Sequence, residues 1–264
     1  MQEIRVESWL ELQECLFADS WHEELRRHRS DFVYRGESDE RNVLTTSLIR
    51  LGGDYATLEQ HLLRSFRKYA PQGVLTTQST WSWLALAKHH SLPTRLLDWS
   101  YSPYVALHFV TASADRYDRD GAVWMVDYVR AGERLPRKLR GEVEEDGGNA
   151  FSVDQLDRLA PTLRDFDRLG DDFVAFFEPP ALDERIVNQY GLFSLMPDPT
   201  ARLDTWLEQH PDLVRRVVIP AELKWEVRDK LDQANVTERV LFPGLDGLTA
   251  WLKRYYSPRE PSAE

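Results

Sequence analysis

Two prolines divide the middle of the sequence into a helix, a short segment and a second helix. A helix capped by Ser79 or Thr80 cannot continue past Pro93, because proline lacks the amide hydrogen that the helix needs. Pro103 suits the first turn of the next helix, where that hydrogen has no helical partner. The segment 94–101 between them is polar, aromatic and flanked by two apolar helices. We therefore expect an irregular but rigidly held segment that suits a binding site.

Other apolar patterns predict an interleaved order of strands and helices. Strands are expected at 31–36, 121–128, 173–177 and 214–219, and further helices at about 54–70, 104–110, 152–169, 221–231 and 245–255. The order lacks the tight strand-helix-strand repeat of a doubly wound sheet, and no glycine-rich phosphate loop follows a strand. The pattern predicts an α+β domain with a mixed sheet and flanking helices.

The domain organisation follows from two local signals. Ser8 and Glu11 have the spacing of a capping box at the start of an N-terminal helix. The acidic run 142–146 is followed by two glycines, which indicates a mobile insertion rather than a domain linker. We expect a single domain over residues 1–264, with a core of about 31–255, an N-terminal helix over 8–29 and an acidic mobile insertion over about 131–149.

Charge and cysteine content exclude several classes of protein. The 33 basic and 44 acidic residues give a net charge of -11, which argues against broad nucleic-acid binding. Residues 31–110 are nearly balanced, so an anion site is electrostatically acceptable there. No apolar run reaches the roughly 20 residues that span a bilayer. The start of the sequence lacks a secretory pattern, and Cys15 is the one cysteine, so we expect a cytoplasmic protein without a membrane segment.

Common catalytic motifs are absent from the sequence. It contains no Gly-x-Ser-x-Gly esterase motif, no phosphate-loop motif and no His-Glu-x-x-His zinc motif. His89 and His90 are adjacent, so on a helix their side chains point about 100° apart and suit one metal poorly. We expect no metal site and a capping or core role for these histidines.

Two arginines and three aromatic residues suit a phosphorylated ligand with an aromatic ring. They are Arg35, Arg95, Tyr34, Trp99 and Tyr101. Guanidinium groups bind phosphate through two hydrogen bonds, and aromatic rings stack on bases. Structural alternatives stay open for each of them: Arg35 could pair with Asp98, the aromatic rings could be core, and Ser102 is better explained as a helix cap.

The same region resembles the FRG-domain family, which is named for a Phe/Tyr-Arg-Gly motif. The matching stretches are Tyr34-Arg35-Gly36, residues 88–109, then Arg185, Gln189, Gly191 and Phe193, and finally residues 241–248. The resemblance spans about residues 31–255. It implies a domain of this family, such as an effector or toxin in bacterial defence.

A second resemblance is to ADP-ribosyltransferases of the arginine-serine-glutamate type. Arg35 and Gly36 match the early strand end, and Ser100 matches the serine. Glu184 and Gln189 lie where the glutamate belongs, although neither is part of a Glu-x-Glu pattern. The resemblance implies a split sheet, NAD as substrate, and ADP-ribosyl transfer or NAD glycohydrolysis. The arginine would hold the diphosphate, and the serine would orient a carboxylate that stabilises the oxocarbenium ion.

These resemblances assign a role to each candidate residue. The catalytic candidates are Arg35, Ser100, Glu184 and Gln189. The ligand-binding candidates are Tyr34, Gly36, Thr94, Arg95, Asp98, Trp99 and Tyr101.

Three functions remain open from the sequence. The first is an NAD-binding, ADP-ribosyltransferase-like domain that modifies a protein or other acceptor. The second is a non-catalytic module that binds a nucleotide or another phosphorylated ligand. The third is a protein-interaction domain whose central motif serves packing, with Arg35 and Asp98 as a buried pair.

Overall fold

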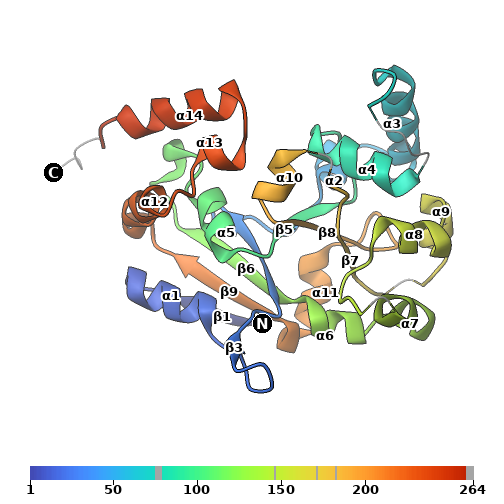
Figure 1. Cartoon of the computed structure of the whole chain (residues 1–264), viewed down its shortest axis with the longest axis horizontal. Helices are drawn as coiled ribbons and strands as arrows, with labels where there is room; N and C mark the ends of the chain where they lie inside the picture. Colours follow the sequence, from blue (N-terminus) through green and yellow to red (C-terminus); the bar gives the residue numbers. More distant parts are fainter. Residues whose placement is uncertain (75–78, 146, 171, 182, 260–264) are drawn as a thin grey trace.

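A seven-stranded mixed sheet forms the centre of the computed structural model, which describes residues 1–74, 79–145, 147–170, 172–181 and 183–259 (Figure 1). In sheet order the strands are β1 (Gln2–Arg5), β9 (Val214–Ile219), β6 (Gly121–Asp127), β4 (Phe32–Glu37), β5 (Leu97–Ser100), β8 (Gly191–Leu195) and β7 (Ala175–Phe177). Neighbouring strands are antiparallel except β1 and β9, which are parallel. The predicted mixed sheet with flanking helices is confirmed.

The sheet is joined weakly at its centre. β4 pairs with β6 at six positions from Phe32 to Glu37, but β4 and β5 share the single pair of Tyr34 with Ser100. The four strands up to β4 and the three strands from β5 onward therefore form two halves with a seam between them. Residues of both halves meet at this seam, where the Arg35 side chain of β4 donates to the backbone oxygen of Asp98 in β5.

Helices cover both faces of the sheet because the side chains of β4, β6 and β9 alternate between two hydrophobic clusters. One cluster joins Tyr34, Met125 and Val217 to α1 (Trp9–Phe17), α5 (Pro103–Val110) and α12 (Lys224–Gln233). The other joins Val33, Trp124 and Val214 to α6 (Tyr128–Glu133) and α11 (Leu203–Gln209). Both faces are therefore buried in this half of the sheet.

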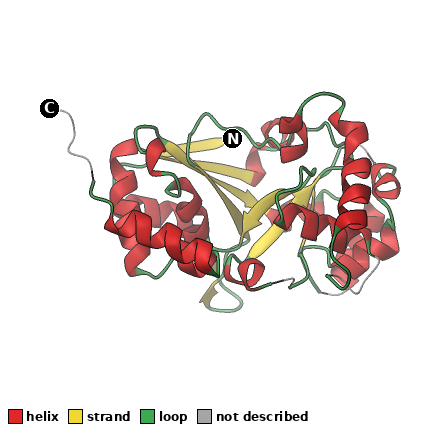
Figure 2. Ribbon diagram, turned by 90° about the horizontal axis from the view of Figure 1, so that it is seen from above, coloured by secondary structure: helices red, strands yellow, loops and turns green. Residues whose placement is uncertain are grey.

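A third hydrophobic cluster lies beside β7 and β8. It contains residues of α4 (Thr80–His89), α7 (Arg137–Glu145), α8 (Val153–Leu159) and α9 (Leu163–Asp167). The remaining helices are α2 (Ser47–Leu51), α3 (Tyr55–Tyr69), α10 (Glu184–Asn188), α13 (Glu238–Leu241) and α14 (Leu245–Tyr256). Figure 2 shows the strands between two groups of helices, one at each end of the molecule.

Three sequence expectations differ from the structure. The N-terminal helix ends at Phe17 and not at residue 29, because Asp19 has a positive φ of 56° and the short strands β2 (Trp21–His22) and β3 (Arg27–His28) follow. The stretch 131–149, expected to be mobile, contains α7, whose Leu139 and Val143 are buried in the core. The segment 94–101, expected to be irregular, contains β5.

Candidate functional site

A cavity of about 380 Å³ opens at the seam between the two halves of the sheet. Seven of the sequence-predicted residues line it: Tyr34, Arg35, Gly36, Asp98, Trp99, Ser100 and Gln189. They come from β4, from β5 and from the residue that follows α10. Stretches more than 150 residues apart in the sequence therefore meet at one site.

Arg35 forms one wall of the cavity and remains accessible, with 17% of its side chain exposed. Its Nε donates to Glu37 Oε1 at 2.8 Å, and its Nη1 donates to the backbone oxygen of Asp98 at 3.0 Å. The Asp98 carboxylate lies 3.8 Å from the same nitrogen. The contact between Arg35 and Asp98 therefore exists, but the pair is not buried, since 55% of the Asp98 side chain is exposed.

Lys88, at the last turn of α4, completes this wall. Its Nζ lies 2.7 Å from Asp98 Oδ2. Partial desolvation raises the pKa of the Asp98 carboxyl, which is still 55% exposed, but the nearby charges of Lys88 and Arg35 outweigh this effect and hold the pKa below its ordinary value. Asp98 is therefore a carboxylate at neutral pH.

The opposite wall comes from α10 and the residues after it. The Ser100 hydroxyl donates to the backbone oxygen of Gln189 at 2.7 Å, and the Gln189 amide donates to the backbone oxygen of Leu241 at 2.9 Å. The Arg185 guanidinium lies 4.7 Å from the ring centre of Phe242, and its buried Nε has no hydrogen-bond partner among the described residues. Ser100 and Gln189 are thus fixed in place, and the Arg185 side chain packs on Phe242 and lines the cavity.

The start of α10 is tied to the end of α4, and the two helices lie next to each other in Figure 1. Asp183 caps α10 by accepting from the backbone of Ile186, and its other oxygen lies 2.6 Å from His89 Nε2. Burial lowers the pKa of His89, so the imidazole is neutral at pH 7 and donates to this carboxylate. Asp183 is consequently engaged by His89, which lines the cavity, and by the backbone of Ile186, which does not.

Cations dominate the cavity lining. Arg35, Arg50, Lys88 and Arg185 line it, and Asp98 is the one carboxylate among the described lining residues. This excess of positive charge contrasts with a chain net charge of -11. Sequence reasoning did not assign Arg50, Lys88 or Arg185 to the site. Two signals were available: Lys88 precedes the helix stop at Pro93, and Arg185 belongs to the stretches that resemble the FRG-domain family.

Four predicted residues lie away from the cavity. Thr94 is fully buried, and Tyr101 donates to Glu178 at 2.9 Å instead of lining the cavity. Glu184 is exposed in the first turn of α10 and does not line the cavity either. Arg95 is buried between Glu59 and Asp167, with distances of 2.6 Å and 2.5 Å. Its guanidinium is therefore used inside the fold and does not face the candidate ligand.

The aromatic residues of the cavity belong partly to the core. Trp99 is 3% exposed and donates from its indole to Ser194 Oγ at 2.8 Å. Tyr34 is 1% exposed, and its hydroxyl donates to the backbone oxygen of Leu16 at 3.1 Å. Both rings expose only a small part to the cavity, so charge contributes more to its character than stacking does.

Gly36 has a packing role at this site. A Cβ atom at this position would lie 1.9 Å from the backbone oxygen of Ala106 in α5. Only glycine therefore allows α5 to approach β4 this closely. The helix in turn places Val105 and Phe109 against the cavity.

Two features are not found among the described residues. No three His, Cys, Asp or Glu side chains gather there as metal ligands. In the same part of the chain, no helix is long and apolar enough to cross a membrane.

Comparison with known proteins gives one match. Residues 30–119 match the family model of the FRG domain, which includes β4, α4, β5 and α5. The match confirms the resemblance inferred from Tyr34-Arg35-Gly36 and from the stretch around Pro93. No curated protein and no solved structure matches the chain significantly.

Proposed function

We propose, for a chain whose residues 30–119 carry an FRG domain, that the cavity at the sheet seam binds NAD and acts on it as ADP-ribosyltransferases do. The excess of cations along the cavity wall carries this proposal. Arg35, Arg50, Lys88 and Arg185 offer the charge that a diphosphate requires. A volume of about 380 Å³ is within the range of small-molecule sites.

The proposed reaction breaks one bond at ribose C1′ of NAD and forms another. The bond between the nicotinamide nitrogen and ribose C1′ breaks, and its electron pair leaves with nicotinamide. The acceptor, water or a nucleophilic group, forms a new bond to C1′ and loses a proton to solvent. Asp98 supports the positive charge that develops on the ribose, because its lowered pKa keeps it ionised.

A second candidate function is nucleotide binding without turnover. Two observations favour it: Glu184 is exposed outside the cavity, and Gln189 contributes a neutral amide that is bound to the backbone of Leu241. An amide binds a ligand through hydrogen bonds but does not supply the negative charge that stabilises an oxocarbenium ion.

One set of measurements tests both candidates. NAD is titrated into the protein by calorimetry, and nicotinamide release is followed by chromatography. Arg35→Lys keeps the charge but loses the bidentate hydrogen bonding of the guanidinium, so we expect NAD binding to weaken roughly tenfold. Arg41→Lys is the matched control, because Arg41 lies in the loop after β4 with 70% of its side chain exposed and does not line the cavity.

The results separate the two functions. The transferase-like function is supported if the wild-type protein releases nicotinamide and Asp98→Asn binds NAD without releasing it. Binding without release in the wild-type protein supports the non-catalytic module. If NAD gives no binding heat, or if Arg41→Lys weakens binding as much as Arg35→Lys does, the proposal fails.

A further inference from the structure

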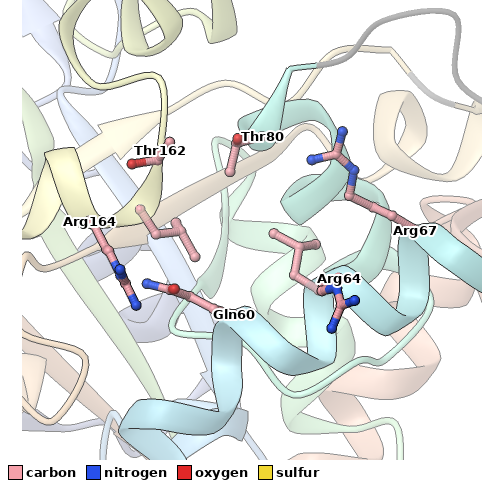
Figure 3. A pocket seen from close by; sticks show the side chains of 8 residues that line it. Gln60, Arg64, Arg67, Thr80, Thr162 and Arg164 are labelled. Atoms are coloured by element: carbon pink, nitrogen blue, oxygen red, sulfur yellow. The ribbon is translucent and has the colours of Figure 1, made fainter.

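A second cavity, of about 440 Å³, lies between α3, α4 and α9, away from the site at the sheet seam. Its lining residues are not shared with that site. Figure 3 shows Arg164 extending from α9 toward the helix that carries Gln60, Arg64 and Arg67. Three guanidinium groups therefore surround one concave surface.

No acidic residue is among the described residues that line this cavity. The nearest carboxylates along the chain already have partners. Glu59 and Asp167 both bind the buried Arg95, and Asp165 accepts a hydrogen bond from the Thr162 hydroxyl at 2.6 Å. These carboxylates are therefore engaged by other groups.

Two of the arginines are available to a ligand. Within the described part of the chain, neither Arg64 nor Arg164 forms an ion pair or a side-chain hydrogen bond, and both are exposed. Arg67 lies over the ring of Trp83 at 5.5 Å, which holds it at the edge of the cavity. Arg64 and Arg67 are three residues apart on α3, so they are neighbours on the helix surface.

The rest of the lining indicates what else the ligand carries. Leu63 and Leu163 are 5% and 2% exposed and form an apolar floor. The hydroxyl of Thr80 donates to the backbone oxygen of Pro161 at 2.9 Å, and the hydroxyl of Thr162 is likewise used. The donors left for a ligand are therefore Arg64, Arg164 and the Gln60 amide.

We propose that this cavity binds a small phosphorylated organic molecule. The phosphate lies between Arg164 and Arg64, and the apolar part of the molecule covers Leu63 and Leu163. Arginine suits phosphate because its planar donors bind two oxygens at once. A small ligand fits better than a long nucleic acid, because the chain as a whole carries a net charge of -11 and repels polyanions.

The test uses phenyl phosphate and inorganic phosphate as probes in calorimetry at low ionic strength. Arg64→Ala/Arg164→Ala removes the two available guanidiniums. Lys68→Ala/Arg168→Ala is the matched control, because it removes the same charge from α3 and from the residue after α9, outside the cavity lining. We expect phenyl phosphate to bind more tightly than phosphate. We also expect its binding to weaken at least tenfold in the first variant and less than twofold in the control.

Three results would overturn the proposal. One is equal loss of phenyl phosphate binding in the two double variants. Another is phenyl phosphate binding that survives in Arg64→Ala/Arg164→Ala but disappears in Arg35→Ala, which would place the ligand at the sheet seam and leave the proposed function intact. The third is a short single-stranded oligonucleotide that binds more tightly than phenyl phosphate and loses its binding in the first variant.

Discussion

The ammonium of Lys88 lies 2.7 Å from the carboxylate of Asp98, and this contact joins the end of α4 to β5 at the wall of the cavity. Arg35 approaches the same carboxylate to 3.8 Å from β4, on the other side of the seam. One negative charge is therefore shared by two cations. Glu37 also pairs with Arg35 at 2.8 Å, so the excess of positive charge in the cavity lining comes from Arg50 and Arg185, and a phosphorylated ligand requires such an excess.

Replacing Lys88 should raise the pKa of Asp98. Lys88→Met removes the closer of the two cations, so we expect the carboxyl to titrate at a higher pH than in the wild-type protein. A carboxyl whose pKa is lowered on folding stabilises the protein above its ordinary pKa of about 3.9, and this contribution is lost as the pH falls through the folded value. A ¹³C NMR titration of Asp98 measures the shift.

The control for this titration is Lys138→Met, which removes an exposed lysine from α7, outside the cavity. We expect it to leave the Asp98 midpoint unchanged. An Asp98 midpoint that is equal in wild type and Lys88→Met would show that the ion pair does not control its charge.

Replacing Arg95 should destabilise the fold rather than weaken ligand binding. Arg95→Met leaves the carboxylate of Glu59, 1% exposed, without its cation, and breaking a buried pair costs about 3 to 5 kcal/mol. Urea unfolding measures the loss. Arg95→Met/Glu59→Gln should recover part of it, because the neutral amide is less costly to bury.

A different arginine serves as the reference for that experiment. Arg130→Met removes a guanidinium that is 50% exposed, and we expect its stability to change by less than about 1 kcal/mol. Equal effects of Arg95→Met and Arg130→Met would contradict a structural role for the buried network.

Adding a methyl group at Gly36 should destabilise the protein at the candidate site. The new Cβ would meet the backbone oxygen of Ala106 at 1.9 Å, so β4 and α5 must separate, which typically costs about 1 to 3 kcal/mol. Gly141→Ala is the matched control. Gly141 is an exposed position within α7, and a Cβ added there would have open space around it to 4 Å, so alanine should stabilise the helix by about 0.5 to 1 kcal/mol.

Chemical denaturation of the two glycine variants gives the comparison directly. Gly36→Ala should unfold at lower urea concentration than wild type, and Gly141→Ala at a higher one. If Gly36→Ala is as stable as wild type, the close approach of the strand and the helix is not what requires glycine.

Local signals in the sequence predicted the elements that flank the site. The Ser79 cap and Pro93 correctly marked the two ends of α4, because both act through neighbouring backbone groups. β5 was not predicted, because its residues Leu97 to Ser100 contain no β-branched side chain and its pairing with β8 joins residues almost 100 positions apart. Such pairing leaves no local pattern.

The candidate site was predicted only in part for a similar reason. Arg35 and Arg95 were both expected to bind a phosphorylated ligand, and the sequence alone does not separate them. The structure does, because the partners of Arg95 come from distant α3 and α9, whereas Arg35 remains accessible in the cavity. The role of Arg50 and Arg185 in the lining likewise depends on tertiary contacts.

Acidification should destabilise the protein through His108, which is fully buried in α5. Burial and the charge of Arg228 lower the pKa of this histidine to about 3, so its imidazole stays neutral and its Nδ1 accepts from Arg228 at 2.9 Å. The unfolded chain has an ordinary pKa of about 6.5 and binds a proton that the native state does not. The contribution of neutral His108 to the free energy of unfolding is therefore fully present above about pH 6.5 and falls as the pH is lowered toward 3.

The variant His108→Gln isolates this contribution, because glutamine can accept the same hydrogen bond but does not titrate. We expect the wild-type protein to lose about 2 kcal/mol more than the variant between pH 7 and pH 5 in urea unfolding. His22→Gln is the control, because His22 lies on the β2–β3 hairpin with 33% of its side chain exposed. If wild type and His108→Gln lose the same stability between pH 7 and pH 5, His108 is not kept neutral by its surroundings.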